Sequence, residues 1–141
     1  MIAVDTNLLV YAHRTGYREH RAAQRAIRKA ASHPGGWGIP LACLSEFWSV
    51  VTHPSCAGGP SSPRQAMGFL EALRAGGALF WAPGEAFWTR LAQAAADLDV
   101  RGARIFDLQI GLTALDHGAT QIWTRDRNFT SLPGLRVFDP L

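Results

Sequence analysis

Hydrophobic residues along this chain follow two spacings, which together predict alternating strands and helices. Short apolar runs are typical of buried strands, whereas apolar side chains three and four positions apart are typical of one helix face. The runs predict strands at residues 2–4, 37–40, 78–82, 121–124 and 136–138. The longer spacings predict helices after residue 7, over 18–31, 41–51, 63–75 and 85–98, and from about Asp107. This alternation indicates an α/β fold with a mainly parallel sheet between helices.

Two of the predicted helices carry specific packing expectations. The helix over 63–75 is expected to pack through Met67, Leu70 and Leu73, and the helix over 85–98 through an apolar face that includes Leu98. The five tryptophans lie mostly in apolar surroundings, which favours packing over base stacking. Trp37 and Trp48 are candidates for a dimer face.

Length and composition place the chain among globular proteins. Its 141 residues fit a single domain, residues 1–141. No apolar run approaches the roughly 20 residues that cross a bilayer, and the first residues lack the pattern of a signal peptide, so we expect a cytoplasmic protein. Cys43 lies in an apolar stretch and Cys56 in a loop rich in Gly, Pro and Ser. A buried thiol and an incidental surface thiol are favoured over a disulfide or metal site.

Positive charge is unevenly distributed along the sequence. The net charge is +3, and six of the fourteen basic residues fall between residues 14 and 29. These are Arg14, Arg18, Arg21, Arg25, Arg28 and Lys29. Such a ridge suits a phosphate backbone or an acidic protein partner, while a solvated helix face is the alternative. Further arginines at 101, 104, 125 and 127 flank acidic residues, and together these features favour a nucleic acid substrate.

Four acidic residues stand where apolar segments end or are interrupted: Asp5, Glu46, Asp107 and Asp126. The first and last follow strand-like runs, and open α/β sheets place their chemistry at the carboxyl ends of strands. Converging carboxylates repel one another, so an ionised cluster needs a cation, and hard oxygen ligands suit Mg²⁺ or Mn²⁺. Each acid taken alone has an ordinary explanation as a helix cap, a helix-edge residue, a first-turn acid or a turn residue. The hypothesis of one shared site therefore depends on the set.

Other common catalytic patterns are missing from the sequence. The five histidines show no metal-ligand spacing, and there is no HExxH pair. The segment Asp5-Thr6-Asn7 follows the first strand where a nucleotide-binding protein would have a glycine-rich loop. Zinc hydrolases and nucleotide-binding proteins of the P-loop or Rossmann type are thus disfavoured.

Four short motifs resemble those of the PIN-domain ribonucleases, and more narrowly of VapC-type toxins from bacterial toxin-antitoxin pairs. They are Val4-Asp5-Thr6-Asn7, Ser45-Glu46-Phe47, Phe106-Asp107-Leu108-Gln109-Ile110 and Thr124-Arg125-Asp126-Arg127-Asn128-Phe129. Each motif is short, but the four occur in the order and approximate spacing of the family. The resemblance spans essentially the whole chain and implies a three-layer α/β/α fold.

The resemblance also implies roles for individual residues. It assigns catalysis to Asp5, Glu46, Asp107 and Asp126, with Asp5, Asp107 and Asp126 as ligands of Mg²⁺ or Mn²⁺. Thr6, Asn7, Thr124 and Asn128 would orient these groups. Many members of the family carry an acid at the position of Asn128. We therefore expect one tightly held ion.

The activity implied by the resemblance is endonucleolytic cleavage of RNA. A metal-activated water would attack the phosphodiester and leave a 3′-hydroxyl and a 5′-phosphate. Arg104, Arg125 and Arg127 would contact the substrate, for which tRNA or rRNA is the family-based expectation. A VapB-type antitoxin and a homodimer are the implied partners.

Two alternatives remain at this stage. A different metal-dependent phosphotransferase would carry a second acid two positions after the first, where this chain has Asn7. A noncatalytic RNA- or protein-binding PIN-like module would retain the fold without the activity.

Overall fold

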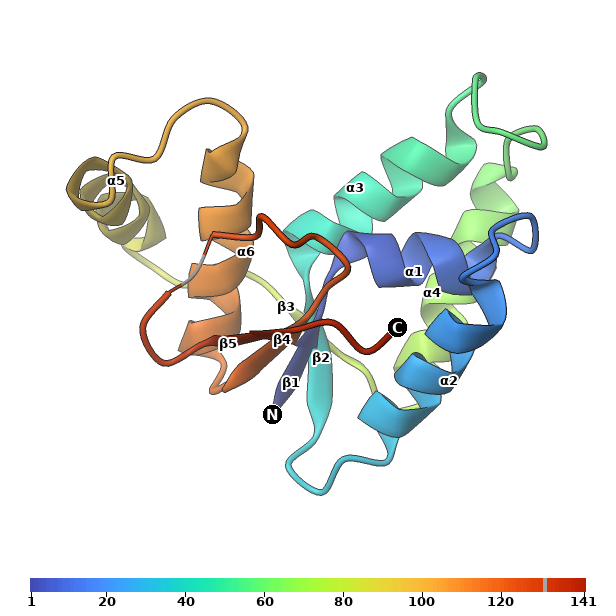
Figure 1. The fold of residues 1–141 in the computed structure, drawn as a ribbon, viewed down its shortest axis with the longest axis horizontal. Helices are drawn as coiled ribbons and strands as arrows, with labels where there is room; N and C mark the ends of the chain where they lie inside the picture. The colour runs from blue at the N-terminus through green and yellow to red at the C-terminus, as the bar shows by residue number, and fades with distance from the viewer. Residues whose placement is uncertain (131) are drawn as a thin grey trace.

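A five-stranded parallel sheet forms the centre of the molecule (Figure 1). The computed structural model describes residues 1–130 and 132–141. The strands are β1 (Ile2–Val4), β2 (Trp37–Pro40), β3 (Leu79–Trp81), β4 (Gln121–Trp123) and β5 (Arg136–Phe138). Their spatial order is β3-β2-β1-β4-β5, and every neighbouring pair is parallel. The predicted parallel sheet is confirmed.

In the part of the chain that the structure describes, six helices cover the sheet from both faces. They are α1 (Thr6–His13), α2 (His20–Ala31), α3 (Leu41–Thr52), α4 (Pro63–Ala75), α5 (Phe87–Asp97) and α6 (Arg104–Asp116). Figure 1 shows α1, α2 and α4 on one side of the sheet and α5 and α6 on the other, while α3 continues directly from β2. The three-layer α/β/α fold is therefore confirmed.

The core lies around the central strand β1. Ile2, Ala3 and Val4 are buried, because helices cover both faces of this strand and its side chains have no route to solvent. On β2, a Cβ atom at Gly38 would lie 2.3 Å from the Trp81 ring. The absence of a side chain at this position is what allows the indole to lie against β2.

Several boundaries and packing predictions were wrong. Helix α6 begins at Arg104 and not near Asp107. The sequence does not mark this start, because Ala103 provides no side-chain cap. Met67 and Leu98 are exposed, although Leu70 and Leu73 of α4 pack against the core as predicted. Helix α4 also buries Ala66, and Leu98 lies at the C-cap of α5, beyond the buried Phe87 and Leu91.

The tryptophan and cysteine predictions had mixed outcomes. Trp37 is only 2% exposed and lies inside the sheet, so it cannot form a dimer face, whereas Trp48 is 37% exposed. Cys43 is buried, Cys56 is partly exposed, and both thiols are free, as predicted.

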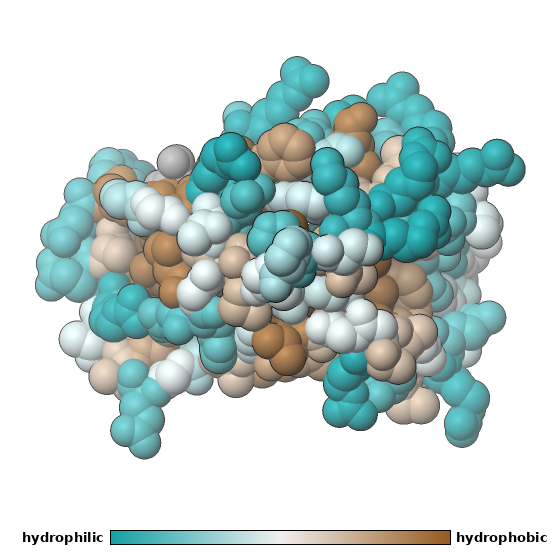
Figure 2. Space-filling view, turned by 90° about the horizontal axis from the view of Figure 1, so that it is seen from below, coloured by the Kyte–Doolittle hydropathy of each residue, from teal (hydrophilic) through white to brown (hydrophobic). Residues whose placement is uncertain are grey.

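The charged surface matches the predicted basic ridge in part. Arg21, Arg25, Arg28 and Lys29 are all exposed on α2. Figure 2 views the molecule from the edge where the amino terminus lies, and hydrophilic side chains gather there on the side that carries α2 and α4 in Figure 1.

Within the described part of the chain, no helix is long and apolar enough to cross a membrane.

Candidate active site

Parallel pairing of β1 with β4 brings the first and last motifs together. Val4 is in register with Trp123, so the residues that follow, Asp5 and Thr124, emerge side by side at the carboxyl edge of the sheet. The backbone N–H of Asp5 donates to the carbonyl of Trp123 at 3.1 Å, which extends the pairing by one step. Segments separated by more than a hundred residues in sequence thus meet at one point.

Asp5 is a buried carboxylate held by three N–H and O–H donors. It is 6% exposed, and it accepts hydrogen bonds from the Thr6 backbone N–H (2.7 Å), Asn7 Nδ2 (2.8 Å) and Thr124 Oγ1 (2.6 Å). Burial raises the pKa of Asp5 above its ordinary value, and nearby Glu46 and Asp107 raise it further, while the bonds from Thr124 and Thr6 lower it. The same carboxylate caps α1, so capping and a place in the acidic cluster are compatible.

Glu46 reaches this cluster from α3. Its Oε2 accepts a hydrogen bond of 2.5 Å from Thr6 Oγ1, while the residue as a whole is exposed. One turn earlier on the same helix, the buried Cys43 places its Sγ 3.7 Å from Asp5 Oδ1. Burial raises the pKa of this thiol well above its ordinary value, and Asp5 raises it further, so the thiol is neutral. Sequence reasoning missed Cys43, although its spacing of three residues from Glu46 was a usable signal.

Asp107 and Asp126 form the outer part of the cluster, and an arginine lies between them. Arg104 Nη1 is 3.0 Å from Asp107 Oδ2 and 3.8 Å from Asp126 Oδ2. The same nitrogen donates to the backbone carbonyl of Asn128. Arg104 therefore offsets part of the negative charge of Asp107 and Asp126 and ties the start of α6 to the loop after β4.

A second set of hydrogen bonds fixes the loop that follows β4. Thr124 Oγ1 accepts from Asn7 Nδ2 at 2.8 Å and from the Asp126 N–H at 3.0 Å. Asn7 Oδ1 accepts from the Arg125 N–H at 2.9 Å. The backbone N–H of Asn128 donates to Asp126 Oδ1 at 2.8 Å. The four predicted orienting residues are thus all bonded within or beside the cluster.

The cluster lines a groove of about 720 Å³. All four acids contribute to its wall, together with Arg104, Tyr11, Tyr17 and Phe106. Of the three arginines predicted to contact substrate, only Arg104 is among the described residues that line it. Arg125 forms an ion pair with Asp139 at 2.8 Å, and Arg127 is exposed.

The donor set can be tested against Mg²⁺ or Mn²⁺. Its hard carboxylate oxygens have the right chemistry, and the repulsion that raises the pKa of Asp5 is the kind that a cation relieves. Within the described residues, however, no three His, Cys, Asp or Glu side chains stand close enough to hold one ion as they are placed. The residues fit the ion by chemistry, and Arg104 supplies the nearest positive charge in the arrangement described.

Comparison with known proteins gives this fold and groove a family. The pattern of the PIN domain matches residues 2–135, and the chain therefore belongs to the PIN-domain family. Its relatives within that family are of the VapC type. Ribonuclease VapC43 of Mycobacterium tuberculosis is 36% identical over 142 residues, which covers 100% of this chain and 96% of the relative. Ribonuclease VapC48 of the same organism is 29% identical, with 96% of this chain and 94% of the relative covered.

Solved structures agree on the fold. The crystal structure of Mycobacterium tuberculosis VapC20, described as a sarcin-ricin loop cleaving toxin, has a TM-score of 0.69 and 17% identity, with 92% of each chain covered. A toxin-antitoxin complex from Klebsiella pneumoniae has a TM-score of 0.68 and 20% identity, covering 100% of this chain and 98% of that one. The resemblance seen in the four sequence motifs is thus confirmed at the level of family and fold.

Proposed function

We propose that this protein is the toxin of a toxin-antitoxin pair and that it acts as a metal-dependent endoribonuclease. The observation that carries the proposal is the convergence of four carboxylates, from four separate segments, on one groove. Its similarity over full length to proteins named VapC ribonucleases supports RNA as the substrate. The ion would be Mg²⁺ or Mn²⁺, held by Asp5, Asp107 and Asp126. We propose a single tightly held ion, because Asn128 offers no carboxylate for a second.

Each residue has a distinct task in this proposal. A divalent cation, when bound, supplies Lewis acidity to the scissile phosphate and the attacking water. Thr6, Asn7 and Thr124 hold Asp5 in one orientation, so little reorganisation is needed on binding. Among the described residues only Thr6 bonds Glu46, through Oε2, so Oε1 remains to accept a proton from the attacking water.

Arg104 is the proposed contact for the substrate phosphate. Its guanidinium side chain is 46% exposed at the groove wall and presents several donors to an incoming oxyanion. Arg125 and Arg127 would act farther along the RNA, because their side chains lie outside the groove lining. Arg127 is exposed, and Arg125 would have to leave its ion pair with Asp139 to take part.

The same comparisons support a proposal for the substrate and the antitoxin partner. A related fold belongs to a toxin named for cleavage of the sarcin-ricin loop, and exposed loops of rRNA or tRNA present unstacked bases to a protein, so we propose such loops as targets. Related folds occur in toxin-antitoxin complexes, which supports a VapB-type antitoxin. A homodimer is also proposed, because Leu41, Trp48 and Val50 expose apolar area along α3. Cleavage of cellular RNA would take place in the cytoplasm.

The decisive experiment compares the unsubstituted protein with Asp5→Ala on total bacterial RNA, with and without Mn²⁺. Asp97→Ala is the matched control, since Asp97 is an exposed residue at the end of α5. We expect discrete cuts that require the metal, that persist in the control and that vanish in Asp5→Ala. Ligation of an adaptor to unmodified product ends identifies the 5′-phosphate. A folded Asp5→Ala variant that still cuts at the same positions would refute the assignment.

A noncatalytic RNA- or protein-binding module is the second candidate. The observation that favours it is the ion pairing of Arg104 with Asp107 and Asp126, which already offsets part of their charge without a metal ion. A calorimetric titration with Mn²⁺ separates the two functions. A binding module whose acids serve only as partners of Arg104 gives no heat of metal binding, whereas the nuclease binds the ion in a manner that Asp5→Ala weakens.

A further inference from the structure

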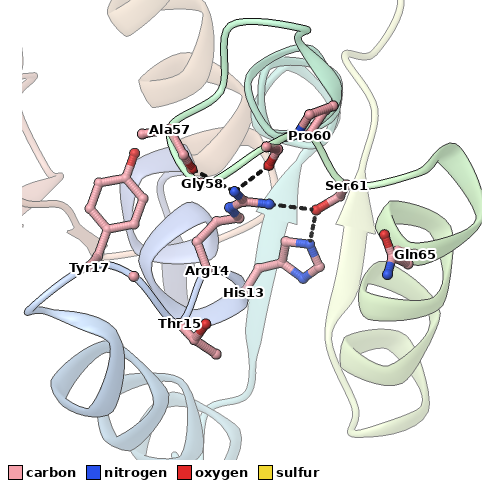
Figure 3. Close-up of a pocket in the computed structure, with 11 residues that line it drawn as sticks. His13, Arg14, Thr15, Tyr17, Ala57, Gly58, Pro60, Ser61 and Gln65 are labelled. Carbon is pink, nitrogen blue, oxygen red and sulfur yellow. Dashed lines mark hydrogen bonds between the residues drawn. The ribbon is translucent and has the colours of Figure 1, made fainter.

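We propose that a second hollow, next to the acidic groove, binds a nucleotide that flanks the cleavage site. The inference rests on the proposed ribonuclease function. The hollow has a volume of about 700 Å³ and lies between the end of α1, the loop before α4 and the first turn of α4 (Figure 3). The side chains of this hollow would recognise the phosphate and base of one flanking nucleotide in single-stranded RNA.

The charge of this hollow is opposite to that of the groove. None of the described residues that line it is acidic, and Arg14 places a guanidinium in its wall. Arg14 Nη2 donates to the carbonyls of Ala57 (2.7 Å) and Gly59 (2.5 Å), and Nη1 donates to Ser61 Oγ at 3.1 Å. These acceptors are neutral, and Arg14 has no ion-pair partner in the part of the chain that the structure describes. Its positive charge is therefore fixed in place and not cancelled, which suits a phosphate.

The surrounding loop is built to keep that charge in position. Ser61 Oγ already accepts from Arg14, so its proton is free to donate to His13 Nε2, 2.8 Å away. Burial lowers the pKa of His13, and Arg14 lowers it further, so the imidazole is neutral and can accept. Gly58 has a φ of 80°, and a Cβ atom there would lie 3.4 Å from Arg14 Nη2. Glycine readily adopts this positive φ, so it suits the loop that surrounds the guanidinium.

Tyr17 connects the two cavities. It lines both the acidic groove and the hollow, and its ring lies 5.1 Å from that of Tyr11, tilted by 59°. A chain with a phosphate near Arg104 can therefore pass over Tyr17 and place a flanking phosphate near Arg14. Aromatic rings are common supports for unstacked bases along such a path. Attraction at the hollow would also offset the repulsion that the four acids exert on RNA.

The test is a charge reversal that preserves the local fold. Gln65 lines the hollow, and its side-chain oxygen accepts from the Ser62 N–H in the capping box of α4. Glu serves equally well in a capping box and favours the first turn of a helix, so Gln65→Glu adds a negative charge without loss of the cap. Gln121→Glu is the matched control. Gln121 begins β4 at the opposite edge of the sheet, and its oxygen accepts from Trp123 Nε1, a role that a carboxylate retains.

Binding is measured by fluorescence anisotropy with labelled single-stranded RNA in the Asp5→Ala background, so that the probe is not cut. We expect Gln65→Glu to weaken binding about fivefold and to reduce the dependence on salt by about one phosphate contact, with no change in Gln121→Glu. RNAs shortened one nucleotide at a time on either side of the mapped cut should reveal one position whose removal abolishes the difference between the variants. Tyr17→Ala should weaken binding of the same RNAs, and Tyr17→Phe should not.

The outcomes separate this proposal from the one on which it rests. If the unsubstituted protein cuts RNA and Gln65→Glu binds as tightly as Gln121→Glu at every RNA length, the hollow is not a subsite, although the nuclease stands. If the unsubstituted protein neither binds nor cuts RNA in the presence of Mn²⁺, the ribonuclease proposal fails and the subsite fails with it.

Discussion

Replacing Thr124 with valine tests how much of the fold's stability depends on holding Asp5 in its charged form. Thr124 is 1% exposed, and its hydroxyl donates to Asp5 Oδ2 at 2.6 Å and accepts from Asn7 Nδ2 and the Asp126 N–H. Valine has nearly the same shape and no hydroxyl. A hydrogen bond to a charged group contributes about 1.5 to 3 kcal/mol, and the added apolar group recovers less than about 1 kcal/mol. We expect a net loss of about 2 kcal/mol, or a decrease in Tm of about 8 °C.

The assay is urea denaturation at neutral pH with a chelator, with Thr124→Ser as the control. Serine keeps the hydroxyl and loses a buried methyl group, which costs about 1 kcal/mol at any pH. The bond from Thr124 lowers the pKa of Asp5, so it stabilises the ionised form. The deficit of the valine variant should therefore be largest above the pKa of folded Asp5 and shrink as the pH falls and the carboxyl group becomes protonated. A valine variant as stable as the native chain at neutral pH, or a deficit that does not change with pH, would refute this reasoning.

Three further predictions follow from contacts in the core and the groove. Without divalent ions, Asp5→Asn should lack one pH-dependent loss of stability: the folded pKa of Asp5 is raised, so charging it costs stability as the pH rises through that pKa, and urea denaturation should show this decrease in the unsubstituted protein but not in the variant. Gly38→Ala should lose about 3 kcal/mol in the same assay, because the new Cβ would lie 2.3 Å from the Trp81 ring, and unchanged stability would contradict this packing. Arg104→Gln should bind Mn²⁺ several-fold more tightly by calorimetry, since a cation beside Asp107 and Asp126 is removed, and weaker binding would show that Arg104 organises the site for the ion.

The fold was predictable because each strand is a short apolar run between clear boundaries. Helix α4 illustrates the favourable case: Ser62 caps it, Pro63 occupies its first turn and Gly76 ends it, so its predicted range matched. Helix α6 illustrates the opposite case, since Ala103 offers no cap and the helix starts earlier than expected. Periodicity shows which residues face inward, but it does not fix the position of a helix end that lacks a signal.

The convergence of Asp5 and Asp126 followed from the rule that parallel strands end at one edge, whereas Glu46 and Asp107 lie on helices. The contacts among them were not accessible in the same way. The 3.7 Å approach of Cys43 to Asp5 and the position of Arg104 between two acids depend on how helices from distant parts of the sequence pack. The hollow around Arg14 was also missed, because its walls come from α1 and from a loop more than forty residues later. Such side-chain distances arise only in the folded state.

The two cysteines allow the opening of the groove to be measured in the unsubstituted protein through their rates of thiol labelling. Cys56 is partly exposed and should react with a thiol reagent at a rate close to that of a cysteine in an accessible loop. Cys43 is fully covered and lies against Asp5 between α1 and α3, so a reagent reaches it only when these helices separate. The ratio of the two labelling rates therefore reports how often the groove opens, without any engineered probe. A ligand that bridges Asp5 and Glu46 should slow the reaction of Cys43 and leave that of Cys56 unchanged.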